Sequence, residues 1–207
     1  MDHFFNCTWK SLPIALQGFE QLVCLGLGNF AQGNNATHQI ASKFQLLFLV
    51  ALNKRVPSEA LVFDPVLTQS EKAVLDGLHF KTSETNTEGQ YNFKGRLTLY
   101  FLPHCPKQLT NNILWANWDD LTSIVLIGNS IKNTVLTLPA SQLSTLGYLK
   151  EASELAEELS LENNFEHQDI FNNLSLHWFK PGHQKKTCKS PDPPSYSQDD
   201  LEFIKNG

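Results

Sequence analysis

The sequence lacks the charge pattern of a protein that binds nucleic acid or an anionic membrane. Its 207 residues contain 16 Lys and Arg against 21 Asp and Glu, a net charge of −5. Because no block of basic residues is present, neither nucleic acid nor a membrane surface is expected as a partner. The most hydrophobic run, Phe44 to Leu52, is too short to span a bilayer and contains Gln45. The N-terminus has no basic region followed by an apolar one, so no secretory signal is expected.

The sequence also lacks a cysteine pattern. Its four cysteines, Cys7, Cys24, Cys105 and Cys188, are widely spaced and include no C-x-x-C pair. This spacing argues against a disulfide framework or a zinc knuckle, and it favours reduced thiols in a cytoplasmic or nuclear protein. H-E-x-x-H, P-loop and EF-hand motifs are absent as well, so no metal site is predicted from the sequence.

Hydrophobic residues make up 41% of the chain, enough for a sizeable core. Continuous apolar runs, typical of strands buried on both faces, alternate with segments long enough for helices. The runs predict strands at 20–28, 59–65, 96–106 and 121–130, helices at 34–55, 68–78, 107–118 and 139–161, and a last edge strand at 172–180. This alternation predicts an α/β fold, a Rossmann-like and mostly parallel sheet with helices on both faces.

Two local signals refine this outline. Thr68 and Glu71 have the spacing of a helix-capping box, and Gly77 is expected to end that helix. From Pro181 onward the chain becomes proline-rich and polar. We therefore expect one domain over residues 1–180 and a disordered tail over residues 181–207.

The stretch from Gly26 to Ala31 fits the pattern G-x-G-x-x-A at the end of the first predicted strand. In dinucleotide-binding folds, such glycines permit a tight turn and a close backbone approach to phosphate. The acidic residue expected about 20 residues later is missing, since Asp64 follows Gly28 by 36 residues. A phosphate loop and a plain tight turn therefore both remain open.

Other chemistry-bearing residues also follow predicted strands. Asp64 can contact a ligand or cap the turn at Pro65. His104 can act as an acid or base, and either His104 or the adjacent Cys105 can ligate haem iron. The alternative for Cys105 is a small buried thiol in a turn shaped by proline.

A third strand end carries Gly128, Asn129 and Ser130, and it resembles the Gly28–Asn29 turn. The two asparagines are expected on neighbouring loops at one sheet edge, which suggests a pocket. Ser130 has no G-x-S-x-G context, so it is not a predicted nucleophile. Asn117 is either a pocket amide or a helix C-terminal cap.

These motifs together resemble one family, the sensitivity-to-red-light-reduced (SRR1-like) family. The matching blocks are CLGLGNF, QLLFLVAL, FDPVLTQSE, LYFLPHCPKQLTNNILWANW and LIGNS, within residues 23–131. The family commonly has Tyr where this chain has Thr110, and Phe where it has Leu67 and Ile131. The candidate ligand-binding residues match the family: Gly26, Gly28, Asn29, Asp64, His104, Asn117, Gly128, Asn129 and Ser130.

The resemblance implies a Rossmann-like fold and a regulatory protein with unknown protein partners. Family members are linked to circadian-clock input, to haem biosynthesis control and to microtubule stability, and no family-wide reaction is established. Two alternatives remain. One is an enzyme that uses a nucleotide or S-adenosylmethionine-type cofactor, with His104 as acid or base and Asp64 as ribose or amine partner. The other is a haem sensor with Cys105 or His104 as the iron ligand.

Overall fold

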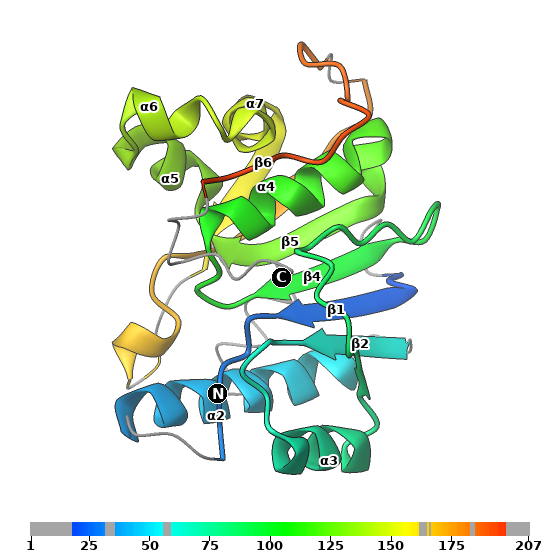
Figure 1. Ribbon diagram of the computed structural model, residues 1–207, viewed down its shortest axis with the longest axis vertical. Coiled ribbons are helices and arrows are strands. Elements are labelled where there is room, and N and C mark those ends of the chain that lie inside the picture. The colour runs from blue at the N-terminus through cyan, green and yellow to red at the C-terminus, as the bar shows by residue number, and fades with distance from the viewer. Residues whose placement is uncertain are drawn as a thin grey trace.

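A computed structural model describes residues 18–31, 36–55, 59–161, 165, 167–182 and 185–197. These residues form one seven-stranded sheet in the order β3-β2-β1-β4-β5-β7-β6 (Figure 1). The strands are β1 (Gln21–Leu25), β2 (Glu59–Phe63), β3 (Lys81–Thr82), β4 (Thr98–Leu102), β5 (Ile124–Asn129), β6 (Ala156–Ser160) and β7 (Leu174–Phe179).

The sheet is mostly parallel, which confirms the predicted α/β fold. Strands β1 to β5 pair in parallel, and β7 pairs antiparallel with both β5 and β6. The chain steps from β1 outward to β3, returns to β4 beside β1, and continues outward through β5. Such a reversal of strand order creates a crevice at the carboxyl ends of the two central strands. Here these strands are β1 and β4.

Helices cover both faces of the sheet (Figure 1). They are α2 (Ala36–Asn53), α3 (Gln69–Gly77), α4 (Lys107–Ala116), α5 (Ile131–Thr137), α6 (Ala140–Leu143) and α7 (Gly147–Leu155), with 3-10 turns η2 (Trp118–Ser123) and η3 (Gln168–Ile170). Alternate residues of β1 reach opposite faces, as strand geometry requires. Leu22 packs in the core with α2 and α3, whereas Val23 packs in the core with α4 and α7.

The capping signal in the sequence is confirmed at α3. The Thr68 side chain accepts from the Glu71 amide, and the Glu71 carboxylate accepts from the Thr68 amide. Gly77 is the last residue of this helix, as predicted.

Two predictions about the C-terminal half were wrong. The single helix expected at 139–161 is two short helices, α6 and α7, followed by β6. Hydrogen bonds from β7 hold residues 156–160 as a strand despite their helical pattern, because tertiary pairing overrides local propensity. Strand β7 was expected at the sheet edge, yet β6 occupies that edge and β7 lies inside.

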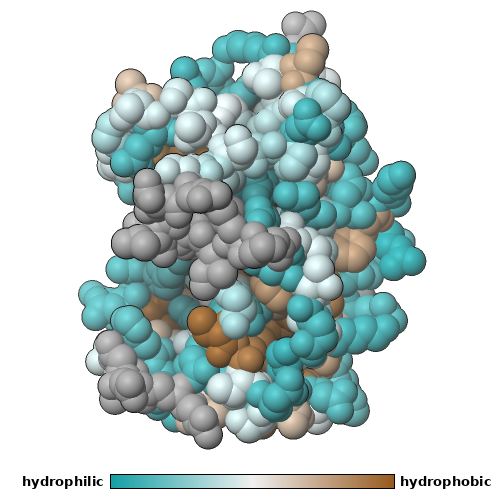
Figure 2. Space-filling model, viewed as in Figure 1, coloured by the Kyte–Doolittle hydropathy of each residue, from teal (hydrophilic) through white to brown (hydrophobic). Residues whose placement is uncertain are grey.

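Hydrophobic residues are unevenly distributed over one face of the molecule. The face in Figure 2 is largely hydrophilic, with one compact hydrophobic area in its lower half. Within the described part of the chain, no helix is both long and apolar enough to cross a bilayer.

Beyond β7, the described residues contain no helix or strand, in keeping with their composition. Residues 185–197 nevertheless run against α4 and α7 (Figure 1). Trp118 Nε1 donates to Thr187 O at 2.7 Å, and Asn111 Nδ2 donates to Tyr196 Oη at 2.8 Å. We call residues 185–197 the C-terminal latch.

Candidate functional site

The glycine turn follows β1 at the central crevice. Gly26 and Gly28 have φ values of +71° and +76°, in the left-handed region that side chains disfavour. A Cβ at Gly26 would lie 2.5 Å from Cys105 Sγ, and one at Gly28 would lie 2.5 Å from Ser42 Oγ. Both glycines are therefore required by backbone angle and by close packing.

Two carboxylates accept hydrogen bonds from the backbone amides of this turn. Gly28 N donates to Asp64 Oδ2 at 2.8 Å. Phe30 N and Ala31 N donate to Glu71 Oε1 at 2.6 and 2.7 Å. These are the amides that a phosphate at such a turn would use. A phosphate would have to displace Asp64 or Glu71 and overcome their negative charge, so the geometry disfavours phosphate at this position.

Asn29 belongs to the same network. Its Nδ2 donates to Val66 O at 3.0 Å and to Glu71 Oε2 at 2.9 Å. Burial by itself raises the pKa of Glu71, but the hydrogen bonds its carboxylate accepts outweigh burial and lower it. At Asp64 burial dominates and raises the pKa of the carboxyl, despite the amide bonds from Gly28 and Val66. The pKa values of the two acids that contact the turn are therefore shifted in opposite directions, upward at Asp64 and downward at Glu71.

His104 lies two residues after the end of β4 and lines a cavity together with the glycine turn. Its φ of 53° is in the left-handed region, which is uncommon for a residue with a side chain. His104 Nε2 lies 2.8 Å from Ile170 O. Because a carbonyl only accepts, Nε2 carries the proton, and in the neutral ring Nδ1 is the acceptor. Strained backbone at a crevice is a recognised mark of a functional residue.

Two cavities meet at His104. The glycine-loop cavity, about 1160 Å³, lies between the glycine turn, α2 and η3. The Asn129 cavity, about 470 Å³, lies between the start of α4 and α5. His104 lines both, and Gly26, Gly28 and Asn29 line the first. The structure thus brings four predicted residues to one crevice.

Cys105 contributes to packing at the end of β1. Its thiol is buried and donates to Leu25 O at 3.0 Å. Burial raises the pKa of this thiol well above its usual range, so it stays protonated at neutral pH. Haem ligation requires an accessible thiolate, and Cys105 does not fit that role.

The two asparagines do not share a cavity. Asn29 faces the network of Glu71, whereas Asn129 Nδ2 donates to Cys105 O at 3.2 Å and Asn129 lines the second cavity. Asn129 Oδ1 is buried without a hydrogen-bond partner in the described part of the chain. Gly128 packs against β4, since a Cβ there would lie 3.2 Å from Leu102 Cβ.

Ser130 caps the start of α5. Its Oγ accepts from Asn133 N at 3.0 Å and donates to Glu158 Oε1. Glu158 Oε2 lies 3.5 Å from Nε2 of the buried His177. Because the carboxylate stands between the hydroxyl and the imidazole, the cluster lacks the serine–histidine contact of a nucleophile.

Asn117 is a helix cap and not a crevice residue. It follows α4, and its Nδ2 donates to Tyr91 O at 2.9 Å and to Ile113 O at 2.8 Å. It lines neither cavity at the strand ends.

Sequence reasoning missed several lining residues. His38 comes from α2, and His167 and Asp169 come from the segment around η3. No local pattern marks them, because only the packing of that segment against α2 brings them to the crevice. Glu71 carried a capping signal, but its bonds to the glycine turn span about 40 residues. Within the described residues, no group of three or more His, Cys, Asp or Glu is arranged to hold a metal ion.

The topology and the crevice define a Rossmann-like α/β protein with a candidate ligand site at its topological switch point. The SRR1 domain model matches residues 11–178, and the chain belongs to the SRR1 family.

Relatives in three organisms support this membership. The SRR1-like protein of Drosophila melanogaster is 36% identical over 183 residues, 85% of this chain and 62% of that protein. The SRR1-like protein of Mus musculus is 42% identical over 133 residues, 59% of this chain and 52% of that protein. Protein SENSITIVITY TO RED LIGHT REDUCED 1 of Arabidopsis thaliana is 27% identical over 170 residues, 78% of this chain and 59% of that protein. The chain thus spans between half and two thirds of these relatives.

Among solved structures, the 23S rRNA methyltransferase ErmE aligns with a TM-score of 0.49 and 12% identity, over 87% of this chain and 68% of that one.

Proposed function

We propose that this SRR1-family protein is a regulator that binds a small polar ligand in the glycine-loop cavity, with His104 as a contact residue. The observation that carries the proposal is His104 itself. Its ring is fixed by Ile170 O, its backbone is strained, and it stands beside the crevice where this fold class binds ligands.

The chemistry of the cavity narrows the ligand class. Asp64 and Glu71 already hold the amides of the glycine turn, so phosphate is disfavoured there. The lining combines hydrogen-bonding side chains such as Thr37, Gln39 and Gln168 with apolar side chains such as Ile40 and Val66. A nucleoside-like molecule without phosphate at the turn fits these groups better than a dinucleotide.

Thermal-shift and calorimetric titrations with adenosine, S-adenosylmethionine, AMP, ADP and NAD test this proposal. We expect the wild type to bind the two compounds without phosphate, adenosine and S-adenosylmethionine. His104→Ala should bind the same compounds at least ten-fold more weakly than the wild type. His79→Ala is a matched control, because His79 is exposed, has a φ of 66° and lines neither cavity. Equal loss in both variants, or a preference for ADP and NAD, would contradict the proposal.

A second candidate is an enzyme with an S-adenosylmethionine-type cofactor. Its support is the place of Asp64 directly after β2, where Rossmann-like folds put the acid that binds ribose hydroxyls. In this structure both oxygens of Asp64 accept from backbone amides, so a ribose would have to displace Gly28 N or Val66 N. The 36-residue spacing that argued against this role includes the 18-residue helix α2. Methyl transfer to a co-purifying acceptor, abolished in Asp64→Ala, would favour the enzyme over the regulator.

A role in circadian-clock input or haem biosynthesis, through protein partners in the cytoplasm or nucleus, is part of the same proposal. The name of the Arabidopsis relative refers to red-light sensitivity. Rescue of rhythm and haem content in cells that lack the gene, by wild type but not by His104→Ala, would connect the crevice to regulation. Haem binding through Cys105 is not proposed, because its thiol is buried.

A further inference from the structure

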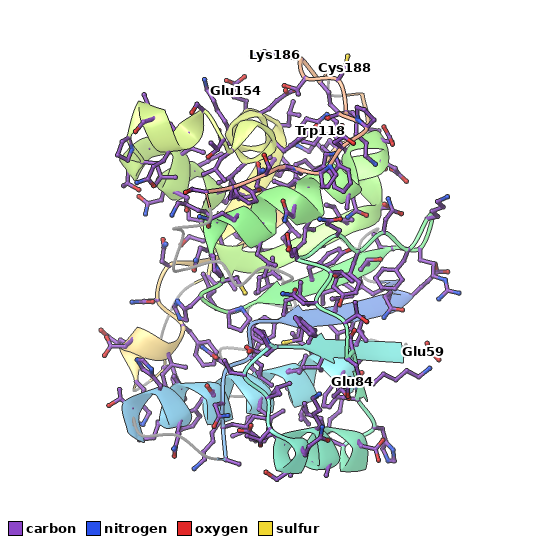
Figure 3. The ribbon with its side chains drawn as sticks, in the orientation of Figure 1. Glu59, Glu84, Trp118, Glu154, Lys186 and Cys188 are labelled. Carbon is purple, nitrogen blue, oxygen red and sulfur yellow. The ribbon has the colours of Figure 1, made fainter. Side chains whose placement is uncertain are left out.

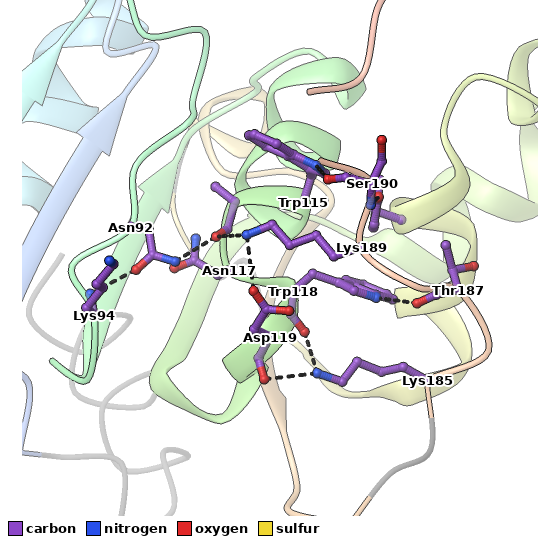
Figure 4. Close-up of polar contacts among 12 residues, drawn as sticks. Asn92, Lys94, Trp115, Asn117, Trp118, Asp119, Lys185, Thr187, Lys189 and Ser190 are labelled. Atoms are coloured by element: carbon purple, nitrogen blue, oxygen red, sulfur yellow. Dashed lines mark hydrogen bonds and ion pairs between the residues drawn. The ribbon is translucent and has the colours of Figure 1, made fainter. Parts of the chain in front are cut away.

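The C-terminal latch is held against the domain by hydrogen bonds between its backbone and side chains of the domain. Trp118 Nε1 donates to Thr187 O, and Trp115 Nε1 donates to Ser190 O at 2.9 Å (Figure 4). Ser190 N donates to Tyr148 Oη at 2.8 Å. Both backbone groups of Ser190 are therefore bound to side chains of the folded domain.

Further contacts hold the latch on either side of Ser190. The buried Glu151 carboxylate accepts from Lys186 N and Thr187 N. The exposed side chain of Lys186 also forms an ion pair with Glu154, close to the exposed Cys188 (Figure 3). Lys189 Nζ lies 5.2 Å from the ring centroid of Trp115, a cation–π distance.

The side chain of Ser190 is not part of this anchoring. Ser190 is exposed, and among the described residues its Oγ accepts a single hydrogen bond, at 3.3 Å from Asp192 N. Pro191 follows it, and Ser190–Pro191 is the single Ser-Pro dipeptide in the 207 residues, which contain no Thr-Pro. A serine before proline in an extended segment is the substrate pattern of proline-directed protein kinases.

We propose that Ser190 is a phosphorylation site for a proline-directed serine/threonine kinase, and that the docked latch restrains its modification. Ser190 Oγ attacks the γ-phosphorus of ATP, the bond to the β–γ bridging oxygen breaks, and ADP leaves. The serine proton passes to the catalytic base of the kinase.

The restraint follows from the two hydrogen bonds that hold the backbone of Ser190, one at its amide and one at its carbonyl oxygen. A kinase binds several residues around the acceptor as an extended chain, so Ser190 N and Ser190 O must first leave Tyr148 and Trp115. The rate of phosphorylation is then proportional to the fraction of molecules with an undocked latch. Removing one hydrogen bond raises that fraction about five-fold.

The test uses the full chain, ATP and a purified proline-directed kinase, with phosphate located by peptide mass spectrometry. Tyr148→Phe removes the hydroxyl that accepts from Ser190 N, and Trp115→Phe removes the donor to Ser190 O. Ser190→Ala removes the acceptor. Tyr91→Phe is a matched control, because the Tyr91 hydroxyl is buried and has no hydrogen-bond partner in the described part of the chain, the latch included.

We expect phosphate on Ser190 in the wild type, none in Ser190→Ala, and about five-fold faster initial rates in Tyr148→Phe and Trp115→Phe. Tyr91→Phe should match the wild type. Absence of phosphate on Ser190 in wild type and in both latch variants would overturn the site. Equal rates in wild type and latch variants, or an equal increase in Tyr91→Phe, would overturn the restraint.

Discussion

The amide of Gly28 donates to Asp64 Oδ2 at 2.8 Å and thereby joins the turn after β1 to the end of β2. The bond requires the left-handed backbone of Gly28, whose φ is +76°. The acid that a dinucleotide-binding fold would offer to a ribose instead supports the glycine turn of its own chain. This relationship makes the turn a rigid wall of the crevice and leads to the first prediction.

Gly28→Ala should lower the free energy of unfolding by about 2–4 kcal/mol. Left-handed backbone costs alanine about 1–2 kcal/mol, and the new Cβ would overlap Ser42 Oγ. Urea denaturation measures the change. Adding Ser42→Ala should recover the part due to overlap but not the backbone strain.

Gly77→Ala is the control for this change. Gly77 lies in α3 with open space around its Cβ position and has no positive φ. Its replacement should leave stability unchanged or raise it by up to about 1 kcal/mol. A Gly28→Ala protein as stable as Gly77→Ala would mean that the turn is not as rigid as described.

Glu71→Gln should destabilise the fold by about 2–3 kcal/mol. One carboxylate oxygen accepts from Phe30 N and Ala31 N, and the other accepts from Thr68 N and Asn29 Nδ2. An amide would turn a donor toward one of these pairs of donors and leave them unsatisfied. Calorimetric melting measures the loss.

Glu84→Gln provides the comparison for Glu71. Glu84 pairs with Lys72, and its side chain is 72% exposed (Figure 3). Exposed ion pairs contribute little, so its replacement should change stability by less than about 1 kcal/mol. Similar losses in the two variants would argue against the network around Glu71.

Acid should weaken the contact between β6 and α5 through Glu158. Burial by itself raises the pKa of Glu158, but hydrogen bonds from His177, Ser130 and Lys132 outweigh it and lower the pKa from 4.5 to about 2. A lowered pKa means that the contribution is complete above pH 4.5 and is lost as the pH falls toward 2. At about 1.4 kcal/mol per unit, this contribution to the free energy of unfolding is at most about 3.5 kcal/mol.

The difference in stability between wild type and Glu158→Gln should therefore shrink as pH falls from about 5 to 2. Taking the difference removes the contribution of Asp64, which has the opposite sign because burial raises its pKa. Glu157→Gln, on the same strand and paired with Lys180, is the control. A constant difference across this range would show that the Glu158 pKa is not lowered.

Cysteine reactivity should follow burial. Cys24 and Cys105 are buried, and burial raises the pKa of both thiols, whereas Cys188 is exposed on the latch. In the native protein at pH 8, iodoacetamide should modify Cys188 at least 100-fold faster than Cys24 and Cys105. Peptide mapping measures each rate, with urea-unfolded protein as the reference. Equal native rates for Cys105 and Cys188 would reopen Cys105 as an iron ligand.

The sequence determined strands β1, β2, β4, β5 and β7 and one helix start. Continuous apolar runs such as Gln21–Leu25 and Ile124–Asn129 are typical of strands buried on both faces, which occur mostly in parallel sheets covered by helices. The Thr68–Glu71 spacing fixed the start of α3, because capping bonds form within one helical turn. Residues 156–160 show the limit of such reasoning, since their state depends on pairing with β7.

The tertiary structure decided the chemistry of the crevice. Only the fold places the two carboxylates on the glycine turn, fixes the His104 ring on Ile170 O 66 residues away, and separates Asn29 from Asn129. It likewise ties Ser190 to Trp115 across 75 residues. Local propensity encodes bonds within a few residues, whereas these bonds depend on how distant segments pack, which no short sequence pattern records.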